Sequence, residues 1–252
     1  MSLTVLVTGA SAGFGMAITR RMVADGHRVI ATARRADKLA ALVAELGADR
    51  VLAHTLDVTD KAAVAALPAS LPEAWREIDV LVNNAGLAQG LSPAWEADMA
   101  DWDRMVDTNV TGLMHVTRAI LPGMVARDRG IVINLSSTAA LYAYPGGHVY
   151  GASKAFVTQF SLNLRADLVG TGVRVTDLEP GLVGGTEFST TRFHGDSTRA
   201  ASVYAGTTPL TAEDIAEAVA WVVALPPHVN INRMEMMPTC QAFAPLAIKR
   251  RT

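Results

Sequence analysis

Short apolar runs that alternate with helix-like stretches constrain this chain more than any other feature. Val, Ile and Leu occupy successive positions in these runs, as is typical of strands buried on both faces of a parallel sheet. Strands that alternate with helices predict a doubly wound parallel sheet in a three-layer α/β/α arrangement. The runs lie at residues 3–7, 28–33, 50–56, 78–82, 131–135 and 174–178, with a weaker one at 233–237.

The spacing between the runs predicts one domain over residues 1–252, because no shift in composition marks a second. Apolar residues at every fourth position, namely Phe156, Phe160, Leu164 and Leu168, predict an amphipathic helix. The stretch at about 182–210 differs, since it is rich in Gly, Ser and Thr and has little periodicity. A long loop in a compact domain is usually a lid or a binding segment, so we expect a substrate loop there. A tolerated surface insertion is the alternative.

Composition and charge exclude several classes of function. The net charge of −2 gives no field for nucleic acid or an anionic membrane. Cys240 is the only cysteine and the six histidines lack metal-ligand spacing, so we expect neither a disulfide nor a metal. The start of the chain lacks a basic region, and the longest apolar run, 218–225, is too short to span a bilayer. We therefore expect a cytoplasmic protein.

A glycine-rich turn, TGASAGFG at residues 8–15, follows the first apolar run and opens a helix. Glycine lets the backbone approach a phosphate, and a helix N-terminus offers free N–H groups and the positive end of the helix dipole. At the first strand-to-helix turn, this pattern indicates a Rossmann-type dinucleotide site. The residues expected to bind the cofactor here are Gly9, Ala10, Ser11, Ala12, Gly13, Phe14 and Gly15.

The same turn also fits G-x-S-x-G, the nucleophile elbow of serine hydrolases. That elbow needs an oxyanion loop from an earlier strand-to-helix connection. Only eight residues precede Gly9, so no earlier connection exists and the hydrolase reading is remote. The chain has no G-x-x-x-x-G-K-[ST] motif, so a P-loop NTPase is not supported.

Two arginines at the end of the second run indicate which dinucleotide binds. An NAD site usually has an acidic residue there, against the ribose 2′-hydroxyl. Here Arg34 and Arg35 follow Ala33, and guanidinium groups pair with a 2′-phosphate. The sequence therefore predicts NADP(H), although a solvated pair at a helix start would give the same pattern.

Tyr150 and Lys154 stand one turn apart on the same face of a predicted helix. A tyrosine that exchanges protons at neutral pH needs its anion stabilised by about 4 kcal/mol, and a neighbouring ammonium group can contribute. A surface tyrosine with a salt-bridging lysine is the alternative. Ser137 follows the run at 131–135, where a hydroxyl could donate to a substrate carbonyl. Ser136 and Thr138 are rivals, and the turn Asn83–Gly86 ends at the same edge.

Together, TGASAGFG, NNAG at 83–86 and S-x12-Y-x3-K resemble the short-chain dehydrogenase/reductase family over nearly the whole chain. The resemblance implies Tyr150 as general acid/base, Lys154 on the nicotinamide ribose, Ser137 orienting the carbonyl and Asn109 completing a proton relay. It also implies a homotetramer built on long helices at about 98–127 and 149–169. The remaining cofactor contacts that it implies are Asp57, Val58, Asn84, Ala85, Gly86, Pro180, Gly181, Val183, Thr186 and Phe188.

A narrower resemblance, carried by residues 179–188, 192–193, 228–232 and 235–238, is to NADP-dependent dehydrogenases of 3-hydroxy acids. It implies hydride transfer to or from a small 3-hydroxy acid or its semialdehyde. Such a substrate needs a cation for its carboxylate, and Arg192 is the candidate, with Arg199 as a rival. The segment 140–144 departs from that group and leaves open another ketone as substrate. A protein that binds NADPH without turnover is a further alternative.

Overall fold

The structure is a computed structural model that describes residues 2–243. Seven parallel strands form one sheet in the order β3-β2-β1-β4-β5-β6-β7, which confirms the doubly wound sheet. The order reverses between β1 and β4, and this leaves a crevice at the carboxyl ends of the strands. The strands are β1 (Thr4–Thr8), β2 (Arg28–Ala33), β3 (Val51–Thr55), β4 (Val80–Asn83), β5 (Gly130–Leu135), β6 (Val173–Pro180) and β7 (Arg233–Met236).

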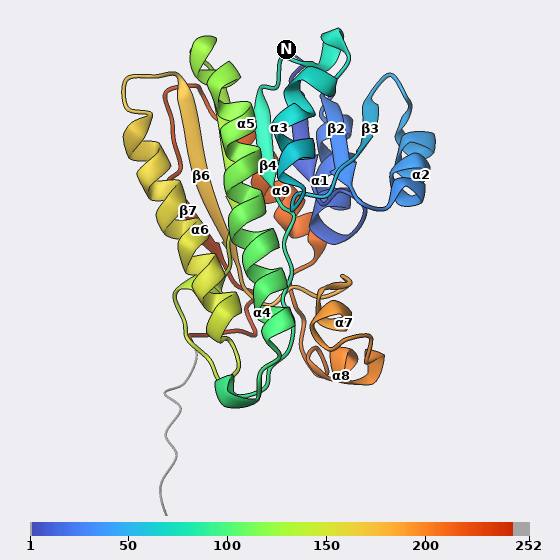
Figure 1. The fold of residues 1–252 in the computed structure, drawn as a ribbon, viewed down its shortest axis with the longest axis vertical. Coiled ribbons are helices and arrows are strands. Elements are labelled where there is room, and N and C mark those ends of the chain that lie inside the picture. The colour runs from blue at the N-terminus through green and yellow to red at the C-terminus, as the bar shows by residue number, and fades with distance from the viewer. Residues whose placement is uncertain (1, 244–252) are drawn as a thin grey trace, which may run out of the picture.

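Helices cover both faces of the sheet and give three layers (Figure 1). One face packs against α1 (Gly13–Ala24), α2 (Ala36–Leu46) and α9 (Ala212–Ala224). The other packs against α3 (Lys61–Ser70), α5 (Leu113–Ala126) and α6 (His148–Asp167). A further helix, α4 (Met99–Val106), runs through a π-helical turn at Asp107–Gly112 into α5.

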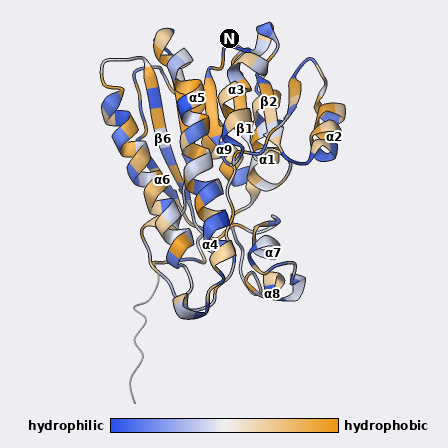
Figure 2. Ribbon diagram, in the orientation of Figure 1, coloured by the Kyte–Doolittle hydropathy of each residue, from blue (hydrophilic) through white to orange (hydrophobic). Residues whose placement is uncertain are grey.

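Alternating side chains of each central strand enter the two cores. In β1, Val5 and Val7 face α1 and α9, whereas Leu6 faces α3 and α5, and all three are fully buried. A strand covered on both faces is apolar at successive positions, which is why the runs stand out in the sequence. Figure 2 shows this hydrophobic interior, and also hydrophilic positions along β6. Those include the buried Asp177 and Glu179.

The segment 182–210, called the substrate segment below, is not the structureless loop that its composition suggested. It holds two short helices, α7 (Phe188–Arg192) and α8 (Ser197–Ser202), and a bridge from Val183 to Leu210. Helices this short present too few turns for a hydrophobic period to be visible in the sequence. In Figure 1 they lie beyond the carboxyl ends of the strands.

Helix α6 buries part of the expected stripe. Leu164 and Leu168 are buried in the core, whereas Phe156 and Phe160 are half-buried and stack on each other with ring centroids 5.7 Å apart. Towards the start of the helix, the buried side holds Tyr150, Lys154 and Val157. None of the helices in residues 2–243 combines the length and apolar character needed to cross a bilayer. The expected domain of residues 1–252 extends beyond the described residues at both ends.

Candidate active site

A continuous cleft runs along the carboxyl ends of the strands. It consists of an outer cavity at Arg34 and Asp57, a middle cavity at the glycine turn, and an inner cavity of about 330 Å³ at Tyr150. Gly86 lines both the outer and middle cavities, and Phe188 lines both the middle and inner ones. The cleft is therefore long enough to hold an extended ligand with one end at Arg34 and the other at Tyr150.

The glycine turn permits a close backbone approach that other residues would block. Gly9 has a φ of +69°, a conformation that side chains disfavour. A Cβ on Gly15 would lie 2.4 Å from the carbonyl oxygen of Gly9 and 2.6 Å from Nδ2 of Asn84. The Asn84 amide donates to the carbonyl oxygens of Thr8, at 2.7 Å, and Gly9, at 3.3 Å. These contacts fix the shape of the turn.

The N-terminus of α1 has donors free for an anion. Its N-cap residue, Ala12, makes no side-chain cap and its first turn carries no acidic residue. By contrast, Asp60 caps α3 and Asp98 caps α4. Open N–H groups at the positive end of a helix dipole suit a pyrophosphate, so the middle cavity fits the central part of a dinucleotide.

Positive charge marks the outer end of the cleft. Arg34 is exposed at the end of β2 and lines the outer cavity. Arg35 donates to Oγ of Ser11 at 3.1 Å and pairs with Glu187 of the substrate segment at 2.9 Å. Because arginines and not an acidic residue directly follow β2, the site suits a 2′-phosphate better than a free hydroxyl.

Most of the residues expected to bind the cofactor line this cleft. Ala10 and Gly15 do not. Ala10 is fully buried, and its N–H donates to the Thr32 carbonyl at 3.0 Å. Gly15 leaves room for the glycine turn to pack closely. Those that line the cleft are Gly9, Ser11, Ala12, Gly13, Phe14, Arg34, Arg35, Asp57, Val58, Asn84, Ala85, Gly86, Tyr150, Lys154, Pro180, Gly181, Val183, Thr186 and Phe188.

Tyr150 lies in the first turn of α6, where the middle and inner cavities meet. Its side chain is buried against the edge of the Phe188 ring, with centroids 5.7 Å apart. Burial raises the pKa of Tyr150 to about 12, although the charge of Arg192 and the Ser137 hydroxyl act in the opposite direction. The phenol is therefore neutral near pH 7 and can donate a proton.

Lys154 lies one turn further along α6 and is also buried. Its Nζ donates to the carbonyl oxygen of Leu135 at 2.7 Å and stands 5.8 Å from the Tyr150 ring centroid. Burial lowers the pKa of Lys154 to about 8, with the charge of Asp177 acting the other way. A cation beside the tyrosine stabilises the tyrosinate form, which is the arrangement that proton exchange requires.

Ser137 follows β5 and begins the short helical turn Thr138–Ala140. Its Oγ accepts from the Ala139 N–H at 3.1 Å and stands 3.3 Å from the Pro180 carbonyl oxygen. Its neighbour Ser136 has another task, because its hydroxyl donates to the Lys154 carbonyl at 2.9 Å. Ser136, Ser137 and Thr138 all line the inner cavity.

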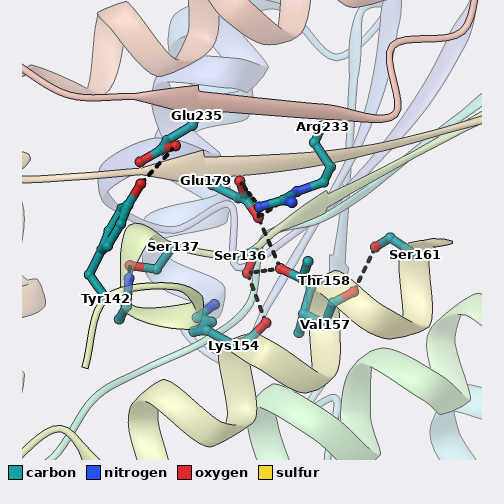
Figure 3. A network of polar contacts seen from close by, with 11 residues as sticks. Ser136, Ser137, Tyr142, Lys154, Val157, Thr158, Ser161, Glu179, Arg233 and Glu235 are labelled. Atoms are coloured by element: carbon teal, nitrogen blue, oxygen red, sulfur yellow. Dashed lines mark hydrogen bonds and ion pairs between the residues drawn. The ribbon is translucent and has the colours of Figure 1, made fainter. Parts of the chain in front are cut away.

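A buried polar network lies behind Lys154, and sequence reasoning did not foresee it (Figure 3). The hydroxyl oxygens of Ser136 and Thr158 lie 2.9 Å apart, and the Thr158 hydroxyl donates to Glu179 at 3.2 Å. Arg233 of β7 donates to both carboxylate oxygens of Glu179 at 2.8 and 3.0 Å. The network ties α6 to β6 and β7 and so holds the backbone of Lys154. Charged residues inside an otherwise apolar run were the available clue.

Asn109 lies in the π-helical turn, a distortion often found at functional sites. Its amide clamps Leu87, accepting from the Leu87 N–H at 2.9 Å and donating to the Leu87 carbonyl at 2.8 Å. It also donates to Oγ of Ser153 at 3.0 Å. A Cβ on Gly86 would lie 3.2 Å from Asn109 Oδ1 and 3.4 Å from Lys154 Nζ, so Gly86 borders both.

Arg192, at the end of α7, lines the inner cavity, and among residues 2–243 no other charged side chain does so. Its Cζ lies 5.1 Å from the Tyr150 ring centroid, and its Nη2 donates to Oη of Tyr144 at 3.1 Å. Arg199 lies outside the inner cavity, over the ring of Phe193. Gln241, which the sequence did not single out, also lines the cavity and accepts from the Leu182 N–H at 2.6 Å.

Comparisons with known proteins agree with this geometry. A family model described as short chain dehydrogenase matches residues 3–197. The NADP-dependent 3-hydroxy acid dehydrogenase YdfG of Salmonella typhimurium is 62% identical over 248 residues, 98% of this chain and 100% of that protein. The serine 3-dehydrogenase of Agrobacterium fabrum is 50% identical over 252 residues, 100% of both chains.

Two solved structures show the same architecture. The closed form of a serine dehydrogenase complexed with NADP+ is 58% identical, with a TM-score of 0.97, covering 99% of this chain and 100% of that chain. The serine dehydrogenase of Escherichia coli is 54% identical, with a TM-score of 0.85, covering 96% of this chain and 100% of that chain. No cluster of three or more His, Cys, Asp or Glu side chains suited to a metal ion occurs in residues 2–243.

Proposed function

The chain belongs to the short-chain dehydrogenase/reductase family, and on this premise we propose that it is an NADP-dependent oxidoreductase of small 3-hydroxy acids and their semialdehydes. One observation carries the substrate class: the inner cavity pairs the phenol of Tyr150 with a single guanidinium, Arg192. A 3-hydroxy acid has a hydroxyl for the first and a carboxylate for the second. The similar proteins named above act on the same class of substrate by name, a 3-hydroxy acid dehydrogenase and a serine 3-dehydrogenase.

The residues of the chain have separate tasks in this proposal. In oxidation, Tyr150 would act as the phenolate, which the Lys154 ammonium stabilises. Its Oη would take the proton from the substrate hydroxyl and become the neutral phenol. Ser137 orients the reacting oxygen, and Arg192 holds the carboxylate. Asn109, beside Lys154, would complete the path by which the proton leaves. Bound NADP+ would accept the hydride from the carbon.

The groups that line the cleft match the chemical parts of NADP(H). The open N-terminus of α1 suits the pyrophosphate, and the glycines keep the backbone there free of side chains. Arg34 and Arg35 would hold the 2′-phosphate, with Asp57 and Val58 bordering the adenine in the outer cavity. The residues from Pro180, at the end of β6, onward would enclose the nicotinamide together with Phe188.

A second candidate is reduction of other aliphatic or aromatic ketones. The aromatic lining of the inner cavity, which includes Tyr142, Tyr144, Phe188 and Tyr204, favours it. In that case the substrate would pack on the rings and leave Arg192 without a carboxylate. Substrates with and without a carboxylate distinguish the two candidates.

Assembly and location form part of the proposal. We propose a homotetramer with contacts through α4–α5 and α6, supported by exposed apolar residues on the first pair, among them Met99 and Val106. Light scattering in solution measures its mass. We also propose a cytoplasmic location, which suits a chain with one cysteine, and cell fractionation tests it.

Removing both arginines of the outer cavity should reverse the choice of cofactor. We expect the Arg34→Ala/Arg35→Ala double variant to weaken NADP+ binding by roughly 100-fold, since two charge-assisted contacts of about 1.5 kcal/mol each are lost. The KM for NAD+ should change little, because NAD+ has no 2′-phosphate. Steady-state kinetics with both cofactors measures the ratio. Parallel losses with NADP+ and NAD+ would contradict the assignment of these residues.

A further inference from the structure

Arg192 brings a positive charge into the inner cavity without an acidic partner. None of the ion pairs in residues 2–243 includes it. Its surroundings are aromatic, with Cζ 4.9 Å from the Phe188 ring centroid and 5.1 Å from that of Tyr150. Its Nε is buried and has no hydrogen-bond partner among these residues. A guanidinium held this way in an apolar wall is suited to an anion from outside the chain.

Tyr144 holds that guanidinium, and a tight turn fixes Tyr144. The sequence Tyr144-Pro-Gly-Gly147 places proline second and a glycine with a φ of +77° third, as a type II turn requires. The Gly147 N–H donates to the Tyr144 carbonyl at 3.0 Å and closes the turn. A Cβ on Gly147 would lie 2.6 Å from the Tyr144 ring, so the ring occupies space that only glycine leaves.

The hydrogen of the Tyr144 hydroxyl is available to donate a hydrogen bond. Its oxygen accepts from Nη2 of Arg192 at 3.1 Å, and its own hydrogen has no acceptor within residues 2–243. Tyr144 and Arg192 both line the inner cavity. A carboxylate placed there could accept one hydrogen bond from the guanidinium and one from the phenol.

We infer that Tyr144 and Arg192 act as one carboxylate clamp, in which Tyr144 positions the guanidinium and supplies a second donor. The inference rests on the proposed function, since it assigns the recognition of the acid group. It makes Tyr144 a determinant of specificity for acids over neutral alcohols. Tyr142, on the same segment, is a natural control, because its hydroxyl stands 3.4 Å from Glu235 instead.

The test compares 3-hydroxypropanoate with its methyl ester, which has the same carbon chain and reacting hydroxyl but no negative charge. In the NADP+-loaded enzyme, Tyr144→Phe should raise KM for the acid about 10-fold, the cost of one charged hydrogen bond. The kcat for the acid and the KM for the ester should stay close to wild type. The Tyr142→Phe control should shift acid and ester equally. In an Arg192→Gln background, Tyr144→Phe should add little to the KM for the acid, because the two residues act as a unit.

Equal KM changes for acid and ester in Tyr144→Phe, or a loss confined to kcat, would overturn the clamp. Calorimetry with malonate, which cannot be oxidised, separates this failure from failure of the proposed function. If wild type oxidises no 3-hydroxy acid but binds malonate more tightly than Tyr144→Phe does, the clamp stands and the proposed reaction does not. If malonate binds both proteins equally, or neither, the clamp is wrong.

Discussion

Replacing Tyr150 with phenylalanine is expected to lower kcat by roughly 10²–10⁴-fold, the usual range for loss of a general acid/base. The variant loses only the Oη that exchanges the proton. Its ring keeps the edge contact with Phe188 and its place beneath Arg192. Stopped-flow or steady-state absorbance of NADPH measures the loss.

Binding and stability separate this chemical loss from a structural one. The variant should still bind NADPH, with at most the roughly 10-fold weakening that the loss of one hydrogen bond causes. It should unfold at a temperature no lower than wild type, because it removes a buried polar group with no loss of packing. A Tyr150→Phe enzyme that keeps more than about a tenth of wild-type kcat would place the proton transfer on another residue.

Replacing Lys154 with methionine should separate activity from stability. Turnover should fall by roughly 100-fold, since the cation that stabilises the Tyr150 phenolate is gone. The fold should not be weakened at pH 7. Burying the ammonium costs on the order of 3 kcal/mol, from the fall in its pKa from 10.5 to about 8. Losing its bond to the Leu135 carbonyl costs about 1–3 kcal/mol, which offsets part of that gain.

The lowered pKa of Lys154 also predicts how the stability of the protein changes with pH. A lysine with a lowered folded-state pKa carries its full burial cost below that pKa, about 8, and loses the cost as pH rises towards the unfolded value of 10.5. The stability of wild type relative to Lys154→Met should therefore rise between pH 8 and 10.5. Urea unfolding of both proteins across this window measures the difference. A constant difference would mean that burial does not lower the pKa of Lys154.

The central strands β1, β2, β4 and β5 could be predicted from the sequence because each is covered on both faces and is therefore mostly apolar, whereas the edge strand β7 (RMEM) left a weaker pattern. The family motifs located Ser137, Tyr150 and Lys154, which the fold brings to two adjoining cavities: Ser137 lines the inner one, Lys154 the middle one, and Tyr150 both. The comparisons confirm the family and the NADP-dependent dehydrogenase class. These features could be predicted because a turn, a helix start or a strand end depends on residues that are close together in the sequence.

The features that escaped prediction depend on contacts between distant residues. Glu179 and Arg233 meet only because β6 and β7 pair, and Gln241 reaches the cavity from far along the chain. The helices α7 and α8 are too short for a period to show. Ala10 lies within the glycine motif, but its side chain faces the core. A sequence motif predicts the course of the backbone but not the direction of each side chain.

Oxidation of 3-hydroxypropanoate, followed as NADP+ reduction at 340 nm, tests the central claim most directly. L-serine and L-allo-threonine belong in the same assay, with NAD+ as the cofactor control. We expect turnover of a 3-hydroxy acid with NADP+, much less with NAD+, and none with Tyr150→Phe. Reduction of neutral ketones by NADPH, with no reaction of any 3-hydroxy acid, would contradict the substrate assignment. Failure to bind NADPH would contradict the account from the glycine turn onward.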